Sequence, residues 1–470
     1  MLGGRIRFGG RRALFALLGL VVLAAVAGSA AFLISAGRDD GSDNATPSAT
    51  TTTSASPAPT REPAPAPVLP ADNADAPPPA AAGLAAALRG PLADKRLGGR
   101  ITARVVDVLT GRVLLDHAGT HLATPASTTK LLTATAVLAT EPADFRFETT
   151  VVTGSRSGEV VLVGGGDPTL AQSSRPTYAG AASIAQLARS VKARTTRPIT
   201  RVVVDGNRFT GSSIGPGWDS DDVSGGYVAP ITAAMVDGGR LKPGLTARSS
   251  SPDLAAGQAL AKALGAPNAV VSRGAAPAHA RTLGVVHSAP LTTIVAQTLT
   301  ESDNTLAEFL ARQVAVATHQ PASFAGAAAA VRRTLVKLGV PAAGVLLHDD
   351  SGLSRDNRIS PAALTQTLRI AASSRHPALH ALFAGMPVGG YAGTLANRYH
   401  DAGSRAGAGY VRAKTGTLSS VSSLAGVVQD RSGRLLAFAL MADQVSATGT
   451  LAAEDALDAV AARLAGCGCR

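Results

Sequence analysis

Alternating apolar and polar positions mark the first regular segments of the chain. Residues 101–117 alternate in this way around Thr110-Gly111, which predicts two strands joined by a tight turn. Residues 147–163 repeat the pattern, with a turn near residues 154–158. Between these hairpins, residues 127–140 are apolar over a length that suits a helix buried on all sides. This part of the chain therefore predicts two hairpins separated by a buried helix.

The middle of the chain is less regular. Residues 164–280 are rich in glycine turns and contain one predicted helix, over 183–194, and one predicted strand, over 199–204. The only tryptophan, Trp218, lies there in a loop of glycine, aspartate and serine. We interpret this stretch as an inserted unit.

Regular patterns return after residue 281. Helices are predicted there over 291–300, 306–318, 322–338, 361–372, 378–383 and 453–464, and strands over 409–413, 423–429 and 435–442. One further short helix is predicted near the N-terminal side of the first hairpin, over 83–88. Strands joined by tight turns cannot form a parallel sheet, because parallel neighbours need long crossovers. The expected fold class is therefore α+β, an antiparallel sheet flanked by helices and interrupted by a large insertion.

The N-terminal segment has the pattern of a membrane anchor. Residues 13–36 contain no charge, and four arginines precede them within residues 1–12. An uncharged run of this length can span a bilayer, which needs about 20 apolar residues. The arginines predict that residues 1–12 stay in the cytoplasm. Two alternatives remain open: cleavage after Ala25-Val26-Ala27, which would release the protein, and twin-arginine export signalled by Arg11-Arg12.

A linker and a charge imbalance follow the anchor. Residues 37–82 consist mainly of Ala, Pro, Thr and Ser, and are expected to be a disordered tether outside the membrane. In residues 1–80 six arginines balance six acidic residues, so the whole net charge of +12 lies on the extracytoplasmic part. There, nucleic acid is excluded as a partner. An anionic cell surface and a merely soluble basic surface are both compatible with the charge.

The chain has two cysteines, Cys467 and Cys469. A disulfide across one residue is strained and no metal-ligand spacing occurs elsewhere, so we assign them no role. The nine histidines are dispersed. We expect no metal and no cofactor.

A serine and a lysine lie three residues apart at the start of the buried helix. On a helix, Ser127 and Lys130 share one face, so the lysine amine reaches the serine hydroxyl. This arrangement suits a nucleophile with its base. The simpler alternative is a helix cap followed by a solvated lysine, which makes the pair weak evidence by itself.

Two further polar clusters lie at the edges of predicted elements. Ser302-Asp303-Asn304 separates two helices, and Lys414-Thr415-Gly416-Thr417 ends a strand. Each by itself fits an ordinary helix cap or strand end. Together with Ser127 and Lys130, they form S-x-x-K, S-x-N and K-T-G in chain order, a set found in class A β-lactamases and penicillin-binding proteins.

On these motifs, the chain resembles the class C low-molecular-mass penicillin-binding proteins, D-alanyl-D-alanine carboxypeptidases/endopeptidases of peptidase family S13. The resemblance covers roughly residues 83–465, and the wide gap between Ser127 and Ser302 fits the insertion of that family. Four strings add to it: residues 164–170, 302–308, 351–355 and 389–395. Asp350 departs from the pattern, in which glycine is expected. The resemblance implies a β-lactamase/transpeptidase-like catalytic domain over 83–163 and 281–470, with 164–280 inserted.

The resemblance also implies roles. Ser127 is expected to form an acyl-enzyme with the penultimate D-Ala, Lys130 to take its proton, and Ser302 to relay a proton to the leaving nitrogen. Backbone N–H groups of Ser127 and Thr417 are expected to form the oxyanion hole. The expected substrate-binding residues are Asn304, Lys414, Thr415, Gly416 and Thr417, with the hydroxyls of Thr415 and Thr417 on the terminal carboxylate.

The expected function is hydrolysis of D-Ala-D-Ala ends of peptidoglycan stem peptides, with endopeptidase action on cross-links as an additional option and β-lactams as inhibitors. One alternative is a β-lactamase or esterase on the same fold, although no glutamate-bearing loop for a deacylating water is evident. Another is a non-catalytic cell-wall-binding protein, which would have no use for five intact motif residues.

Overall fold

The main sheet is antiparallel, as the hairpin patterns predicted. In the computed structural model, which describes residues 75–469, five strands have the order β10-β11-β12-β1-β2. Their bounds are β1 Ile101–Asp107, β2 Val113–His117, β10 Val411–Leu418, β11 Val421–Gln429 and β12 Leu435–Ala442. Every neighbouring pair is antiparallel. All side chains of β12 are buried, because helices cover both faces of the sheet.

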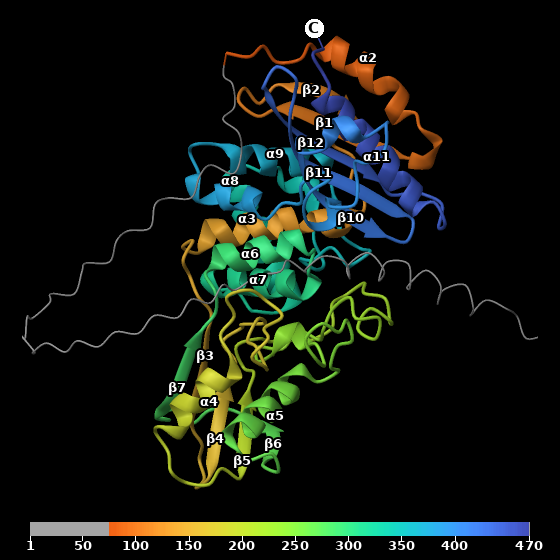
Figure 1. Cartoon of the computed structure of the whole chain (residues 1–470). Coiled ribbons are helices and arrows are strands. Elements are labelled where there is room, and N and C mark those ends of the chain that lie inside the picture. The colour runs from red at the N-terminus through yellow and green to blue at the C-terminus, as the bar shows by residue number, and fades with distance from the viewer. Residues whose placement is uncertain (1–74, 470) are drawn as a thin grey trace, which may run out of the picture. The chain divides into compact units, whose positions relative to one another are not determined.

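Two helices from opposite ends of the described chain share one face of this sheet. They are α2 (Ala81–Leu92) and α11 (Thr450–Ala465), which pack on one another beside the strands (Figure 1). The other face is covered by α9 (Pro361–Ala372), and α3 (Lys130–Thr140) packs on α9. Around α3 lie α6 (Leu291–Thr300), α7 (Asn304–Ala317) and α8 (Phe324–Leu338). Helix α3 is thus central to this layer, which explains its uninterrupted burial from Lys130 to Leu138.

A second five-stranded sheet has the order β6-β5-β4-β3-β7. The strands are β3 Glu148–Thr153, β4 Glu159–Val163, β5 Arg201–Asp205, β6 Val270–Arg273 and β7 Thr282–His287. Strands β4, β5 and β6 are parallel. Helices α4 (Ile184–Lys192) and α5 (Pro252–Leu264) provide the crossovers that parallel neighbours need, and both pack on this sheet (Figure 1).

This topology differs from the expected boundaries of the insertion, 164–280. The hairpin β3–β4 and strand β7 lie outside that range, yet they pair with the inserted strands and not with the main sheet. Alternation along a strand shows that one face is buried but not which sheet buries it. Helix α5 and strand β6 were not predicted, because their apolar positions are diluted by alanine, glycine and serine.

Local differences concern the two motif-bearing segments. The predicted helix over 127–140 starts with a 3₁₀ turn, Ala126–Thr129, before α3. Strand β10 continues to Leu418, so Lys414 to Thr417 lie within a strand and not after its end. The remaining short elements are β8 Val345–Leu346, β9 Arg358–Ile359, α10 Ala381–Ala384 and 3₁₀ turns at Lys95–Leu97, Asp237–Gly239, Ala342–Gly344, Pro377–His380, Gly393–Leu395 and Arg405–Gly407.

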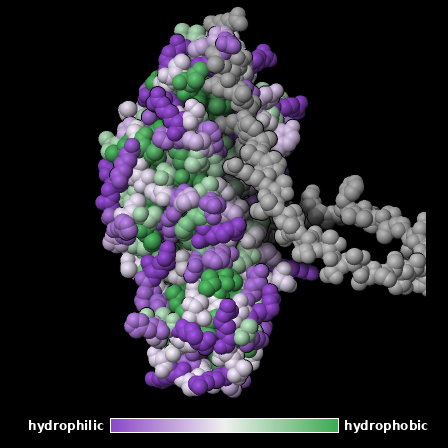
Figure 2. Space-filling model, turned by 90° about the vertical axis from the view of Figure 1, so that its left-hand side faces the viewer, coloured by the Kyte–Doolittle hydropathy of each residue, from purple (hydrophilic) through white to green (hydrophobic). Residues whose placement is uncertain are grey.

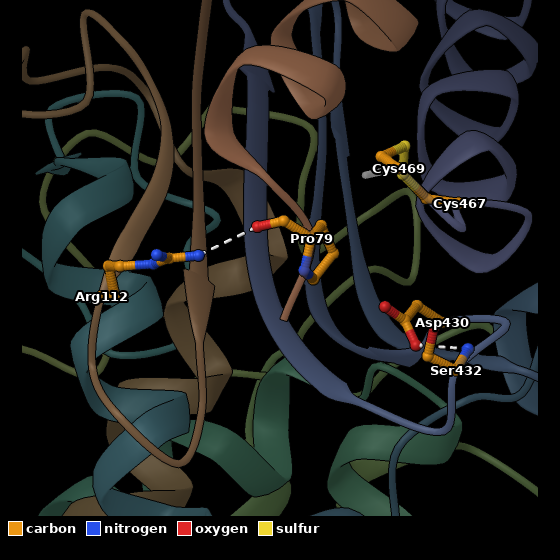
Figure 3. The surroundings of a disulfide bond; sticks show 6 residues. All are labelled: Pro79, Arg112, Asp430, Ser432, Cys467 and Cys469. Carbon is orange, nitrogen blue, oxygen red and sulfur yellow. Dashed lines mark hydrogen bonds between the residues drawn. A yellow bond between two sulfur atoms is a disulfide. The ribbon is translucent and has the colours of Figure 1, made fainter. Parts of the chain in front are cut away.

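The two cysteines, to which the sequence assigned no role, are joined as a disulfide after α11 (Figure 3). The backbone on both sides of the bond is held by other segments. Ala80 N–H donates to the carbonyl of Cys469 at 2.8 Å, and Arg431 N–H donates to the carbonyl of Cys467 at 3.3 Å. The end of α11 is thereby connected to the start of α2.

Hydrophilic and hydrophobic residues are interspersed on the face seen in Figure 2. Within residues 75–469, no helix has the length and apolar character needed to cross a membrane. The predicted anchor at 13–36 and most of the predicted linker lie outside the described residues.

Candidate active site

A strained turn presents Ser127 in the 3₁₀ turn that precedes α3. The preceding residue, Ala126, is fully buried and has a φ of 48°, a conformation that costs a non-glycine residue energy. Neighbouring hydroxyls hold the turn: Thr128 Oγ1 and Ser423 Oγ both donate to the carbonyl of Pro125, at 2.7 and 2.6 Å. Because Ser423 lies on β11, the main sheet fixes the position of the serine turn.

The lysine one turn later is completely buried and makes three hydrogen bonds. Lys130 Nζ lies 2.9 Å from Ser127 Oγ, 2.6 Å from Asn304 Oδ1 and 2.8 Å from the carbonyl oxygen of Ser351. The structure therefore brings together the first two sequence motifs. A solvated first-turn lysine, the alternative considered for the sequence, is wrong for this chain.

This geometry suits a lysine that gives up a proton. Asn304 Oδ1 and the Ser351 carbonyl can only accept, so a neutral amine would keep its two N–H bonds on them and turn its lone pair toward Ser127 Oγ. Burial lowers the pKa of Lys130 to about 8, against the opposing charges of Asp349, Asp303 and Glu308. Loss of the proton thus becomes accessible near neutral pH.

The second motif, residues 302–304, caps helix α7 and makes contacts with residues between 164 and 280. Asp303 accepts the N–H of Leu306 at 3.0 Å, as an N-cap does. Its other oxygen accepts from Tyr178 Oη at 2.8 Å and forms an ion pair with Arg240 at 3.3 Å. Asn304 Nδ2 donates to the carbonyl of Tyr227 at 3.1 Å. Residues between 164 and 280 therefore hold both Asp303 and Asn304.

Ser302 has an unusual backbone and no hydrogen-bonded partner in the described part of the chain. Its φ is 56°, in the left-handed region. The expected bridge from Ser302 to Lys130 is not formed in this structure, since the amine bonds instead to Ser127, Asn304 and Ser351.

The third motif contributes a second buried lysine. Lys414 Nζ donates to the carbonyl of Thr415 at 2.9 Å. Burial, followed by the charges of Lys130 and Arg398, lowers the pKa of Lys414 well below its ordinary value. Gly416 lies so close to the serine turn that an added Cβ would be 2.6 Å from the Pro125 carbonyl, which brings the motif against Ser127.

The two threonine hydroxyls of this motif differ in their contacts. Thr415 Oγ1 is 2.8 Å from Thr394 Oγ1, and either can donate. Thr417 Oγ1 donates to Glu454 Oε1 on α11 at 2.6 Å. The hydroxyl proton of Thr417 is therefore already used, which the sequence did not indicate for a residue expected to bind a carboxylate.

Sequence reasoning missed the loop that completes the lysine environment. Asp349 accepts from Ser351 Oγ at 3.0 Å and from the indole N–H of Trp218 at 2.8 Å. These bonds shape the turn that presents the Ser351 carbonyl to Lys130. The sequence motifs included residues 351–355 and 389–395. They did not reveal that the Ser351 carbonyl contacts Lys130 or that Thr394 contacts Thr415, because such contacts form only in the folded chain.

Comparison with known proteins identifies the family. The profile of the D-Ala-D-Ala carboxypeptidase 3 (S13) family matches residues 84–250 and 242–464. The chain belongs to this family. The protein is accordingly a D-Ala-D-Ala carboxypeptidase, the activity that the three motifs predicted.

Two curated relatives of this carboxypeptidase are similar over most of their length. Carboxypeptidase Rv3627c of Mycobacterium tuberculosis is 44% identical over 399 residues, which cover 83% of this chain and 85% of the relative. Carboxypeptidase DacB of Mycolicibacterium smegmatis is 44% identical over 410 residues, covering 86% and 88%.

A solved structure confirms the fold class. Penicillin binding protein 4 (dacB) of Haemophilus influenzae superposes with a TM-score of 0.63 at 22% identity, covering 76% of the carboxypeptidase and 92% of that protein. The mixed α+β arrangement of sheets flanked by helices is thus shared. Within residues 75–469, no cluster of three or more His, Cys, Asp or Glu side chains is placed to hold a metal ion.

Proposed function

We propose that the carboxypeptidase acts through an acyl-enzyme on Ser127. The observation that carries this proposal is the 2.9 Å contact between Ser127 Oγ and the buried amine of Lys130. In the neutral amine form, Lys130 takes the hydroxyl proton while Oγ attacks the carbonyl of the penultimate D-Ala. The C–N bond then breaks, the leaving D-Ala takes up a proton, and water hydrolyses the ester.

The other motif residues are proposed to bind substrate and move the proton. Ser302 relays the proton to the leaving nitrogen once substrate is bound, and Asn304 holds the substrate amide. Lys414 and Gly416 line the acyl site, and the backbone N–H groups of Ser127 and Thr417 bind the oxyanion. Thr415 receives the terminal carboxylate, since its contact with Thr394 leaves it able to donate. Thr417 shares this role only when its hydroxyl leaves Glu454.

The proposed substrates are peptidoglycan stem peptides that end in D-Ala-D-Ala. Cross-linked stem peptides are a second proposed substrate, which would make the enzyme an endopeptidase as well. β-Lactams are proposed to acylate Ser127, and one support is a structure of the H. influenzae protein complexed with a β-lactam. No metal or cofactor takes part in these steps.

Labelling with fluorescent penicillin tests this mechanism. The full chain should become covalently labelled and should release D-Ala from a peptide ending in D-Ala-D-Ala. Ser127→Ala should abolish both, by on the order of 10⁴-fold or more, because the nucleophile is lost. Ser157→Ala, on an exposed turn between β3 and β4, is the matched control and should leave both activities unchanged.

Other outcomes separate the alternatives. Rapid turnover of penicillin without lasting label would indicate a β-lactamase. Absence of labelling and of D-Ala release would instead leave a wall-binding protein without this chemistry.

The enzyme acts outside the cytoplasm, as a cell-wall enzyme of this family does. We further propose that residues 13–36 remain as a membrane anchor, that residues 37–82 are the tether, and that the catalytic and inserted parts follow. Mass spectrometry of the mature N-terminus tests the anchor. A terminus beyond Ala27 would show cleavage and a released enzyme.

A further inference from the structure

Two buried carboxyl groups near the serine turn have oxygen atoms without a hydrogen-bond partner among residues 75–469. Glu308, on α7, and Asp350 are both fully buried. Glu308 Oε1 accepts the backbone N–H groups of Asp350 and Ser351, at 3.1 and 2.8 Å. Glu308 Oε2 and both carboxyl oxygens of Asp350 have no hydrogen-bond partner in the described part of the chain. Two ionised carboxylates could not remain buried in this state.

The cation near Glu308 and Asp350 can balance one ionised carboxylate but not two. Asp349, the neighbour in sequence, is a further acid in the same loop. Arg312, one turn beyond Glu308 on α7, is the cation that acts on both. The residue is 1% exposed, and its Cζ lies 4.6 Å from the centre of the Phe324 ring. A single cation balances a single charge, so a proton on one of the two acids resolves the excess.

The same groups hold the backbone that contacts the lysine. The N–H of Ser351 is bonded to Glu308, while its carbonyl accepts from Lys130 Nζ at 2.8 Å. The carbonyl of Asp350 accepts from Thr133 Oγ1 on α3 at 2.6 Å. Ser351 alone therefore separates Glu308 from the lysine amine, because its N–H is bonded to Glu308 and its carbonyl to Lys130.

We propose that Glu308 and Asp350 together carry one proton, on one carboxyl or the other, and act as a positioning pair, which holds the Ser351 carbonyl on Lys130 and limits the negative charge beside it. This inference rests on the proposed role of Lys130 as base. The pair touches no reacting atom.

The direction of the titrations agrees with the geometry. Burial, and then the charge of Asp349, raises the pKa of Glu308 to about 8. Burial and the charges of Glu308 and Asp349 raise the pKa of Asp350 well above its ordinary value. The charged groups that act on Lys130 are Asp349, Asp303 and Glu308, with Lys414 on β10 as the cation beside it. Removing negative charge from the pair should therefore favour the neutral amine.

The first test detects the proton. Difference infrared spectroscopy of the full chain at neutral pH should show a protonated carboxyl band. Glu308→Gln and Asp350→Asn should each remove it, because the single remaining acid ionises beside Arg312. Asp350→Gly, which restores the expected glycine, serves as a second variant and should remove the band as well. Absence of the band in the unmodified enzyme would overturn the proposal.

The second test follows the acylation of Ser127 by penicillin as a function of pH. Glutamine and asparagine keep the size of both side chains, so a variant with both substitutions removes the remaining charge. The pH of half-maximal acylation should fall by about one in this double variant. It should change little in Asp350→Asn alone, where the charge of Glu308, which acts on Lys130, remains. A double variant that is slower at every pH with an unshifted midpoint would show a packing role and contradict the proposal.

Two controls keep the tests distinct. Asp167→Asn removes another buried acid, whose pKa burial raises to about 6 and which is bonded to Thr169, so it should not move the acylation midpoint. If the unmodified enzyme is not acylated at all, the proposed function fails, while the infrared band still decides whether the pair carries a proton.

Stability provides a third readout. A carboxyl whose folded pKa is raised stabilises the fold fully below its unfolded pKa of 4.5, and this contribution is lost as pH rises through about 8. The unmodified enzyme should therefore lose thermal stability between these pH values. The double variant should lose less, and an equal loss in both would contradict a proton on the pair.

Discussion

At the scale of single residues, burial determines the chemistry of Lys130. Its amine is enclosed and bonded to three acceptors, and desolvation is the largest cause of its lowered pKa. The sequence could place Ser127 and Lys130 on one face, because helical spacing is local. It could not show that the lysine is buried, since burial depends on α7 and on the loop around Ser351.

The titration of Lys130 predicts the pH dependence of acylation. Below about pH 8 the amine is protonated, so the rate of penicillin labelling should rise about tenfold per pH unit and become level above that value. Rapid-quench labelling over this range measures it. Lys130→Arg should lose activity by about 100-fold or more, because a guanidinium keeps its proton. Lys337→Arg, on the exposed face of α8, is the control, and a flat profile would contradict Lys130 as the base.

Glu454 is predicted to weaken the binding of the substrate carboxylate. It accepts the Thr417 hydroxyl at 2.6 Å and so places a carboxylate beside a residue proposed to bind the substrate carboxylate. Glu454→Gln should lower KM for a D-Ala-D-Ala peptide by roughly two- to fivefold with little change in kcat. Steady-state kinetics check this. Asp455→Asn, an exposed neighbour on α11, should leave KM unchanged, and a higher KM in Glu454→Gln would refute the prediction.

At the scale of elements, the loop 349–352 packs against the serine turn, and Gly352 lies at the point of closest approach. Gly352 has a φ of 84°, and an added Cβ would lie 1.9 Å from the carbonyl oxygen of Ala126. The predicted helices α6 and α9 agree with the structure at both ends, because their apolar periodicity is strong. The contact of this loop with the turn could not be predicted, since it joins segments more than two hundred residues apart.

Gly352→Ala should therefore disturb the site and not only the backbone. We expect it to displace the serine turn, to reduce acylation strongly and to destabilise the protein. Gly339→Ala is the matched control, with a φ of 97° but no atom within 4 Å of an added Cβ. The control should cost only the left-handed strain, roughly 1–2 kcal/mol, and keep normal acylation. Thermal unfolding and penicillin labelling measure both, and equal effects would contradict the packing argument.

At the scale of the whole molecule, residues 164–280 contact the candidate active site. Arg240 and Tyr178 bond to Asp303, and the carbonyl of Tyr227 bonds to Asn304. These contacts lie at the start of α7, next to Lys130. The interpretation of residues 164–280 as an inserted unit did not include this contribution.

Arg240→Met should then reduce acylation while the fold is retained. The expected loss is between about two- and thirtyfold, because the cap of α7 loses its ion pair and Asn304 is less well held. Arg201→Met removes an ion pair with Glu159 inside the second sheet and should have no such effect. Penicillin labelling together with circular dichroism distinguishes them. Equal activity in both variants would show that the insertion does not act on the site.

The sequence alone determined the reaction class, because the three motifs and their order along the chain can be recognised without knowledge of the fold. It also determined the antiparallel main sheet, since tight turns between strands exclude parallel neighbours. Only the tertiary structure decided which sheet contains β3, β4 and β7, how Ser351 and Asp349 complete the lysine site, and that Glu308 and Asp350 are buried together. These features depend on contacts between segments that are distant in the chain. The burial of a side chain, and the charges that surround it, are set only when those segments pack together.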